Sequence, residues 1–111
     1  MIILFKEPEK QRELEKLHHK LQLILFDFAE MVYTRYQRPI VITSMIRKED
    51  TTSVHAWGRG VDVALIPDAD NEALRKEVNE VFKYGDEEHD TCPPLDHGTS
   101  PHFHFQCRTE V

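Results

Sequence analysis

Long hydrophobic runs are missing from this 111-residue chain. The most apolar stretch, residues 21–28, falls well short of the roughly 20 apolar residues that a membrane-spanning helix needs, so it reads as part of a core helix. A second apolar stretch, residues 2–5, has no basic segment before it and ends at Lys6, Glu7 and Pro8. It is too short for the apolar region of a signal peptide. We therefore expect a protein made in the cytoplasm, with no export signal in this chain.

Positive charge is also scarce. The chain has 14 Lys and Arg residues against 20 Asp and Glu, which gives a formal net charge of −6. Most nucleic-acid binders neutralise phosphates with a basic surface, so we do not expect nucleic acid as a partner. Hydrophobic residues make up 40% of the chain and charged residues 31%, an ordinary balance for a globular protein. The length suits a single domain, residues 1–111, built on one core.

Cysteine is limited to Cys92 and Cys107. The pair can form a disulfide, bind metal or do neither, and the absence of an export signal favours two reduced thiols. Histidine, by contrast, is plentiful. The chain has seven histidines, and four of them lie between residues 89 and 104. That density points to metal or proton chemistry.

Hydrophobic spacing predicts two helices and three strands. In chain order these are a helix at 8–38 with at most one break, strands at 39–43 and 61–66, a helix around 74–82 that stops before Gly85, and a strand at 102–107. A surface excursion, residues 44–57, and a turn with cap residues, 67–71, connect them. The order indicates an α+β domain, with a small antiparallel or mixed sheet and two covering helices.

Asp62 is the unusual residue of the predicted strand at 61–66. A carboxylate between Val61 and Val63 costs several kcal/mol to bury unless a cation or strong donors compensate it. Backbone N–H groups or Arg59 can fill that need. A metal can also fill it, because His55 lies seven residues earlier and the chain between them contains glycines that permit a tight bend.

The predicted last strand offers a third metal ligand. Its period of two places His102 and His104 on one face, with Phe103 and Phe105 on the other. Two solvated histidines at a sheet edge would need no function. If His104 instead joins His55 and Asp62, three protein ligands leave a fourth position for water, which is the arrangement of a catalytic zinc site.

The whole pattern resembles a known family. Ser-x-His-x-x-Gly-x-x-x-Asp at residues 53–62, followed by Pro-His-x-His at 101–104, is similar to the zinc peptidases that cut peptidoglycan peptides. These are the D-alanyl-D-alanine carboxypeptidases and dipeptidases and the L-alanyl-D-glutamate endolysins. The resemblance covers residues 39–106 and implies a metallopeptidase-like fold in which His55, Asp62 and His104 bind zinc.

The resemblance also implies a role for Arg47. Ile-Thr-Ser-Met-Ile-Arg at residues 42–47 looks like the family's strand followed by Ser-Gly-Tyr-Arg, whose arginine holds a substrate carboxylate or carbonyl. A guanidinium fork suits that task, although a solvated surface arginine is the simpler reading. The turn keeps the arginine of the family pattern and loses its glycine and its aromatic residue.

The general base is where this sequence departs most from the family. Many members place Glu or Asp three residues before the last zinc histidine, and this chain has Pro101 there. Other branches use a histidine, so His102 is the first candidate because it shares a strand face with His104. His97 is the second candidate and Asp96 the third, and both belong to a predicted loop.

Three hypotheses follow. The first is a zinc-dependent peptidase, carboxypeptidase or endopeptidase, that hydrolyses peptidoglycan stem peptides or cross-links. It would act at the cell wall, either as a phage or prophage product released by a separate membrane protein or as a domain of a longer exported parent. The second is a non-catalytic zinc-binding domain used for binding or assembly, which Pro101 favours. The third is a metal-free fold, which leaves Asp62 unexplained.

Overall fold

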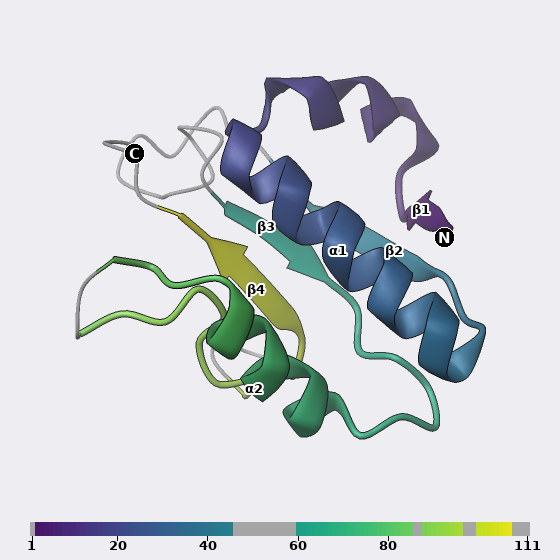
Figure 1. Cartoon of the computed structure of the whole chain (residues 1–111). Helices are drawn as coiled ribbons and strands as arrows, with labels where there is room; N and C mark the ends of the chain where they lie inside the picture. Colours follow the sequence, from purple (N-terminus) through teal and green to yellow (C-terminus); the bar gives the residue numbers. More distant parts are fainter. Residues whose placement is uncertain (1, 46–59, 86–87, 97–99, 108–111) are drawn as a thin grey trace.

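The computed structural model describes residues 2–45, 60–85, 88–96 and 100–107, which form a four-stranded sheet and three helices (Figure 1). The elements in chain order are β1 (Ile3–Phe5), the 3₁₀-helix η1 (Pro8–Lys16), α1 (His19–Tyr36), β2 (Ile40–Ser44), β3 (Gly60–Val63), α2 (Asn71–Val81) and β4 (Phe103–Gln106). The predicted α+β class is confirmed.

The helix predicted at 8–38 is divided in two. Its first part, η1, is a 3₁₀-helix that buries none of its residues, because residues 8–16 are mostly charged and offer no apolar stripe to pack. The break follows at Leu17 and His18. The His18 ring then accepts a hydrogen bond from the Lys20 backbone N–H at 3.1 Å and caps α1. At the other end Gln37 adopts φ 55°, a left-handed conformation that ends α1 two residues before Pro39.

The apolar stretch at 21–28 lies inside α1 and serves the core. Its buried members recur every three or four residues and include Leu21, Ile24, Leu25 and Phe28. In the part of the chain that the structure describes, no helix is long and apolar enough to cross a membrane. The interpretation of this stretch as a core helix is therefore confirmed.

The sheet is mixed, with the strand order β1-β2-β3-β4. β1 runs parallel to β2, while the β2–β3 and β3–β4 pairs are antiparallel. The sequence did not predict β1, because its three residues show no alternation that separates a strand from any short apolar run. Its place depends on a distant partner, since Ile3 pairs with Ile40 and Phe5 with Ile42.

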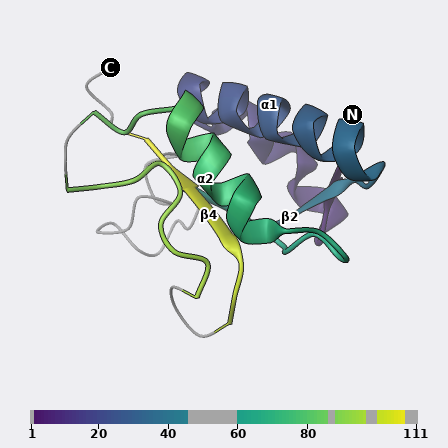
Figure 2. The same cartoon turned by 60° about the horizontal axis from the view of Figure 1, so that its bottom comes forward.

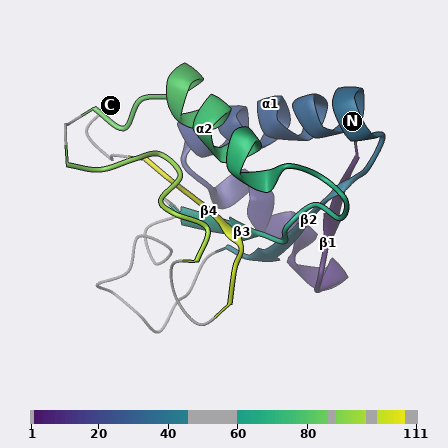
Figure 3. The ribbon, with the colours of Figure 1, turned by 90° about the horizontal axis from the view of Figure 1, so that it is seen from below.

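Both α-helices lie on one face of the sheet, side by side (Figures 2 and 3). Phe28 of α1 packs edge-on against Phe103 and Phe105 of β4, with ring centroids 4.9 and 5.0 Å apart. An ion pair between Arg35 and Glu77 joins the two helices at the surface. Neither α-helix covers the opposite face of the sheet, where the side chains of Asp62 and His104 lie.

The outer edge of β4 is covered by the segment 90–95. The backbone N–H groups of His102 and Gln106 donate to the carbonyls of Leu95 and Thr91, both at 2.9 Å. Asn79 of α2 holds this segment by a double hydrogen bond, since its amide donates to the Cys92 carbonyl at 2.9 Å and accepts from the Cys92 N–H at 2.8 Å. Strand β4 is thereby fixed from both sides.

Candidate metal centre

Asp62 occupies the middle of β3, the strand with every residue buried. Only 7% of Asp62 is exposed, as the sequence predicted for a carboxylate inside a β-branched run. Because side chains alternate along a strand, Asp62 points away from the helices while Val61 and Val63 point into the core. In the register of β3 and β4, Asp62 lies directly opposite His104.

Asp62 and His104 are in direct contact. The Asp62 Oδ1 atom lies 2.8 Å from Nδ1 of His104, and the two side chains are 10% and 14% exposed. A carboxylate accepts hydrogen bonds, so Nδ1 of His104 carries the hydrogen in this arrangement. His104 therefore gives Asp62 a partner without a metal, and burial of the carboxylate alone no longer requires one.

The same two atoms also suit a zinc ion. Two ligands about 2.1 Å from a tetrahedral zinc ion would lie about 3.4 Å from one another. Oδ1 and Nδ1 are 2.8 Å apart, so they would have to separate by about 0.6 Å, and the hydrogen of the imidazole would move to Nε2. One carboxylate and one imidazole are a common part of zinc sites, so the residues present fit the metal.

His102 lies beside this pair. Its Nδ1 atom is 2.7 Å from the Ser100 carbonyl oxygen, which can only accept, so Nδ1 is the protonated nitrogen of the neutral ring. Nε2 is then the basic nitrogen, and it lies 3.7 Å from Asp62 Oδ1. Because His102 and His104 both approach Asp62 Oδ1 while Phe103 and Phe105 are buried in the core, the prediction that the two histidines share a face is confirmed.

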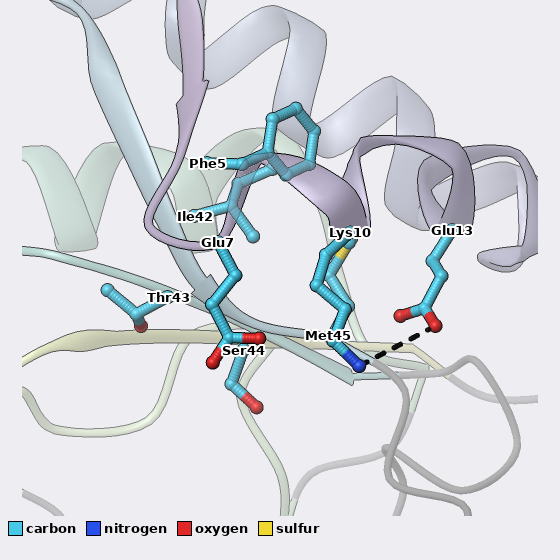
Figure 4. Close-up of a pocket in the computed structure, with 8 residues that line it drawn as sticks. All are labelled: Phe5, Glu7, Lys10, Glu13, Ile42, Thr43, Ser44 and Met45. Atoms are coloured by element: carbon cyan, nitrogen blue, oxygen red, sulfur yellow. Dashed lines mark ion pairs between the residues drawn. The ribbon is translucent and has the colours of Figure 1, made fainter.

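A β-bulge in β2 adds two hydroxyl groups that the sequence did not reveal. Ile42 lies opposite Val63 and Ser44 opposite Asp62, so two residues of β2 occupy the space of one residue of β3. The side chains of Thr43 and Ser44 point away from Phe5 and Ile42 (Figure 4). Ser44, Asp62 and His104 thus form a row across three strands. No local pattern in the sequence signals this bulge, which depends on pairing between distant strands.

Three predicted site residues, His55, Arg47 and His97, lie outside the described residues. Within residues 2–45, 60–85, 88–96 and 100–107, no three His, Cys, Asp or Glu side chains form a group suited to a metal ion. The described part of the chain thus brings together Asp62, His104 and His102, and the assignment of His55, Asp62 and His104 as metal ligands stays a prediction. Asp96, the last candidate base, is exposed.

Cys92 and Cys107 are both buried, and no disulfide joins them. Burial raises the pKa of the Cys92 thiol to about 12, and the backbone N–H of His104 offsets this only in part. A thiol with so high a pKa is a poor nucleophile near neutral pH, so Cys92 belongs to the packing of β4 rather than to the chemistry of the site.

No protein-family model matches the chain, and no curated protein matches it. The resemblance to the peptidoglycan peptidases therefore rests on the motifs at residues 53–62 and 101–104.

Proposed function

We propose that this protein is a zinc-dependent peptidase that hydrolyses peptide bonds of bacterial peptidoglycan stem peptides or cross-links. In this proposal His55, Asp62 and His104 hold the metal. The observation that carries it is the contact of Asp62 Oδ1 with His104 Nδ1 at 2.8 Å on the face of the sheet opposite the helices. The substrate class comes from the motif resemblance alone.

The described ligands hold a fixed arrangement because both are on paired strands. Asp62 and His104 lie opposite one another in the β3–β4 ladder, and the segment 90–95 supports β4 on its outer edge. Sites built on strands keep their geometry better than sites built on loops. Zinc in this position would supply a Lewis acid for the scissile carbonyl and would lower the pKa of a water molecule to about 7.

His102 takes the role of general base in this proposal. Its hydrogen bond to Ser100 leaves Nε2 free to accept a proton, and Nε2 faces the ligand Asp62 at 3.7 Å. Pro101, where many relatives in the proposed family have an acidic base, has no group that could accept a proton. Arg47 would orient an anionic group of the peptide.

Pro101 also supports a second candidate, a non-catalytic zinc-binding domain of the same fold that serves binding or assembly. The two candidates share their zinc ligands and differ only in hydrolysis. The deciding experiment incubates the purified protein, with and without added zinc, with purified peptidoglycan and measures newly released amino groups. The peptidase proposal predicts release that depends on zinc, whereas a zinc-loaded protein that releases none would establish the binding domain.

The same assay tests the base. His102→Ala should keep its fold and its zinc while hydrolysis falls by about 10²-fold or more, the usual scale for a lost acid–base group. His19→Ala is the matched control, because His19 is exposed at the start of α1, and α1 lies on the face of the sheet opposite to Asp62 and His104. A loss of zinc affinity together with activity would instead show that His102 orients a ligand. If His97→Ala is inactive and His102→Ala is active, His97 is the general base. If both variants stay active, Asp96 becomes the next candidate for the base.

A further inference from the structure

A cavity lies next to the candidate metal centre, between η1 and β2 (Figure 4). Its volume is about 200 Å³, roughly the space of seven water molecules. That is smaller than a typical site for a whole drug-sized ligand and fits one side chain. We propose that this cavity binds the long basic side chain of a substrate residue, an inference that rests on the peptidase function proposed above.

Ser44 connects the cavity to the metal centre. It lines the cavity and also lies opposite Asp62 in the sheet, while Asp62 lies opposite His104. Adjacent strands are about 4.8 Å apart, which places Ser44 about 5 Å from Asp62 and about 10 Å from His104 along the row. An extended peptide spans about 3.4 Å per residue, so the cavity accepts a side chain two or three residues from the bond cleaved at the metal.

The charges at the cavity favour a cation. Its rim carries the carboxylates of Glu7 and Glu13 and the ammonium of Lys10, which sum to one negative charge. Lys10 Nζ lies 3.8 Å from Glu13 Oε1, beyond hydrogen-bond distance, although the Glu13 side chain is only 17% exposed. Within the described residues Glu7 forms no ion pair. Its carboxylate extends toward Ser44 (Figure 4). An incoming ammonium group would form ion pairs with both carboxylates.

The floor of the cavity suits an aliphatic stem. Phe5, Ile42 and Met45 line it with apolar atoms, and the hydroxyls of Thr43 and Ser44 lie at its polar side. A lysine-like side chain has this division, with a chain of methylene groups that packs on apolar surface and a charged end that reaches polar groups. Neither a purely apolar side chain nor a carboxylate would match both parts.

The test compares binding of a synthetic stem peptide that contains lysine with binding of the same peptide after Nε-acetylation, measured by calorimetry. A chelator removes zinc beforehand, so binding is measured without hydrolysis. The parent protein should bind the lysine peptide about ten-fold more tightly, and Glu13→Gln should reduce that preference about five-fold. Lys10→Gln should increase it, because a competing cation is removed. Glu9→Gln, the same charge change at an exposed position of η1 that does not line the cavity, should leave it unchanged.

Equal affinity for the two peptides, or equal effects of Glu13→Gln and Glu9→Gln, would overturn the assignment of the cavity. Hydrolysis of both peptides by the zinc-loaded parent protein is measured separately. This second measurement tests the peptidase proposal independently of the cavity. Selective binding without hydrolysis would support the cavity and refute the peptidase. Hydrolysis of both peptides with the same kcat/KM, with no effect of Glu13→Gln, would refute the cavity alone.

Discussion

Asn79→Ala should destabilise the protein, because Asn79 holds the segment 90–95 that supports β4. Asn79 makes two hydrogen bonds to the backbone of Cys92, a residue with no exposed surface. The Cys92 carbonyl also accepts from Arg75 at 3.0 Å and would keep that partner. The Cys92 N–H would keep none of its described partners.

The expected magnitude follows from this difference. A buried N–H left without a partner costs about 1–3 kcal/mol, and the lost bond to a carbonyl that keeps another donor costs about 0.5 kcal/mol. Asn79→Ala should therefore lower the free energy of unfolding by about 2.5 kcal/mol. The assay is urea denaturation, in which the midpoint should fall while the slope stays the same.

The matched control is Glu80→Ala, a change at the next position of α2 where the side chain is exposed. Glu80→Ala should alter the free energy of unfolding by less than about 0.5 kcal/mol. Amide hydrogen exchange offers a second readout, because the Gln106 N–H donates to the Thr91 carbonyl in the supported segment and should exchange faster in Asn79→Ala. If Asn79→Ala and Glu80→Ala unfold at the same urea concentration, the segment 90–95 does not fix β4 as described.

Three further predictions concern the core, a thiol and the substrate. Phe28→Ala should cost about 3–5 kcal/mol in urea denaturation because Phe28 is fully buried, whereas Phe26→Ala, at a position 37% exposed, should cost far less. Native Cys92 should resist iodoacetamide at pH 8, with modification read by mass spectrometry. Its pKa of about 12, raised above the ordinary 9.0, also means that stability falls as pH rises from about 9, and Cys92→Ala should reduce that loss. Arg47→Lys should retain zinc and lose much of kcat/KM, since lysine cannot make a two-pronged contact with the substrate. Unchanged kinetics would show that Arg47 does not bind the substrate.

Much of the fold was predictable because periodicity in this chain is local. The alternation of Phe103 and Phe105 with His102 and His104 is enough to assign β4 and its two faces. Asp70 was likewise visible as a cap residue, and its side chain accepts from the Ala73 N–H at 3.1 Å. Strand β1 was not predictable, since three residues become a strand only by parallel pairing with β2.

The candidate site also has residues that local sequence patterns could predict and residues that they could not. Asp62 stood out because a charge interrupts an apolar run, and His104 because it lies on the polar face of a strand. Their contact required the register of β3 and β4, which no local pattern specifies. Prediction of the cavity beside Ser44 would require the register of two strand pairs. The bulge depends on pairing of β2 with β3, and the position of Glu7 and Glu13 at the rim depends on where β1 leaves the sheet. Sequence patterns therefore singled out Asp62 and His104 and missed the hydroxyls and carboxylates around them.

The central claim is that Asp62 and His104 are zinc ligands and not merely a hydrogen-bonded pair. Crystals grown with zinc, with diffraction recorded at the zinc absorption edge, test it most directly. We expect one anomalous peak about 2.0 to 2.2 Å from an oxygen of Asp62 and from ring nitrogens of His55 and His104. Asp62 and His104 still in hydrogen-bond contact, with no peak between them or with zinc bound elsewhere, would contradict the claim.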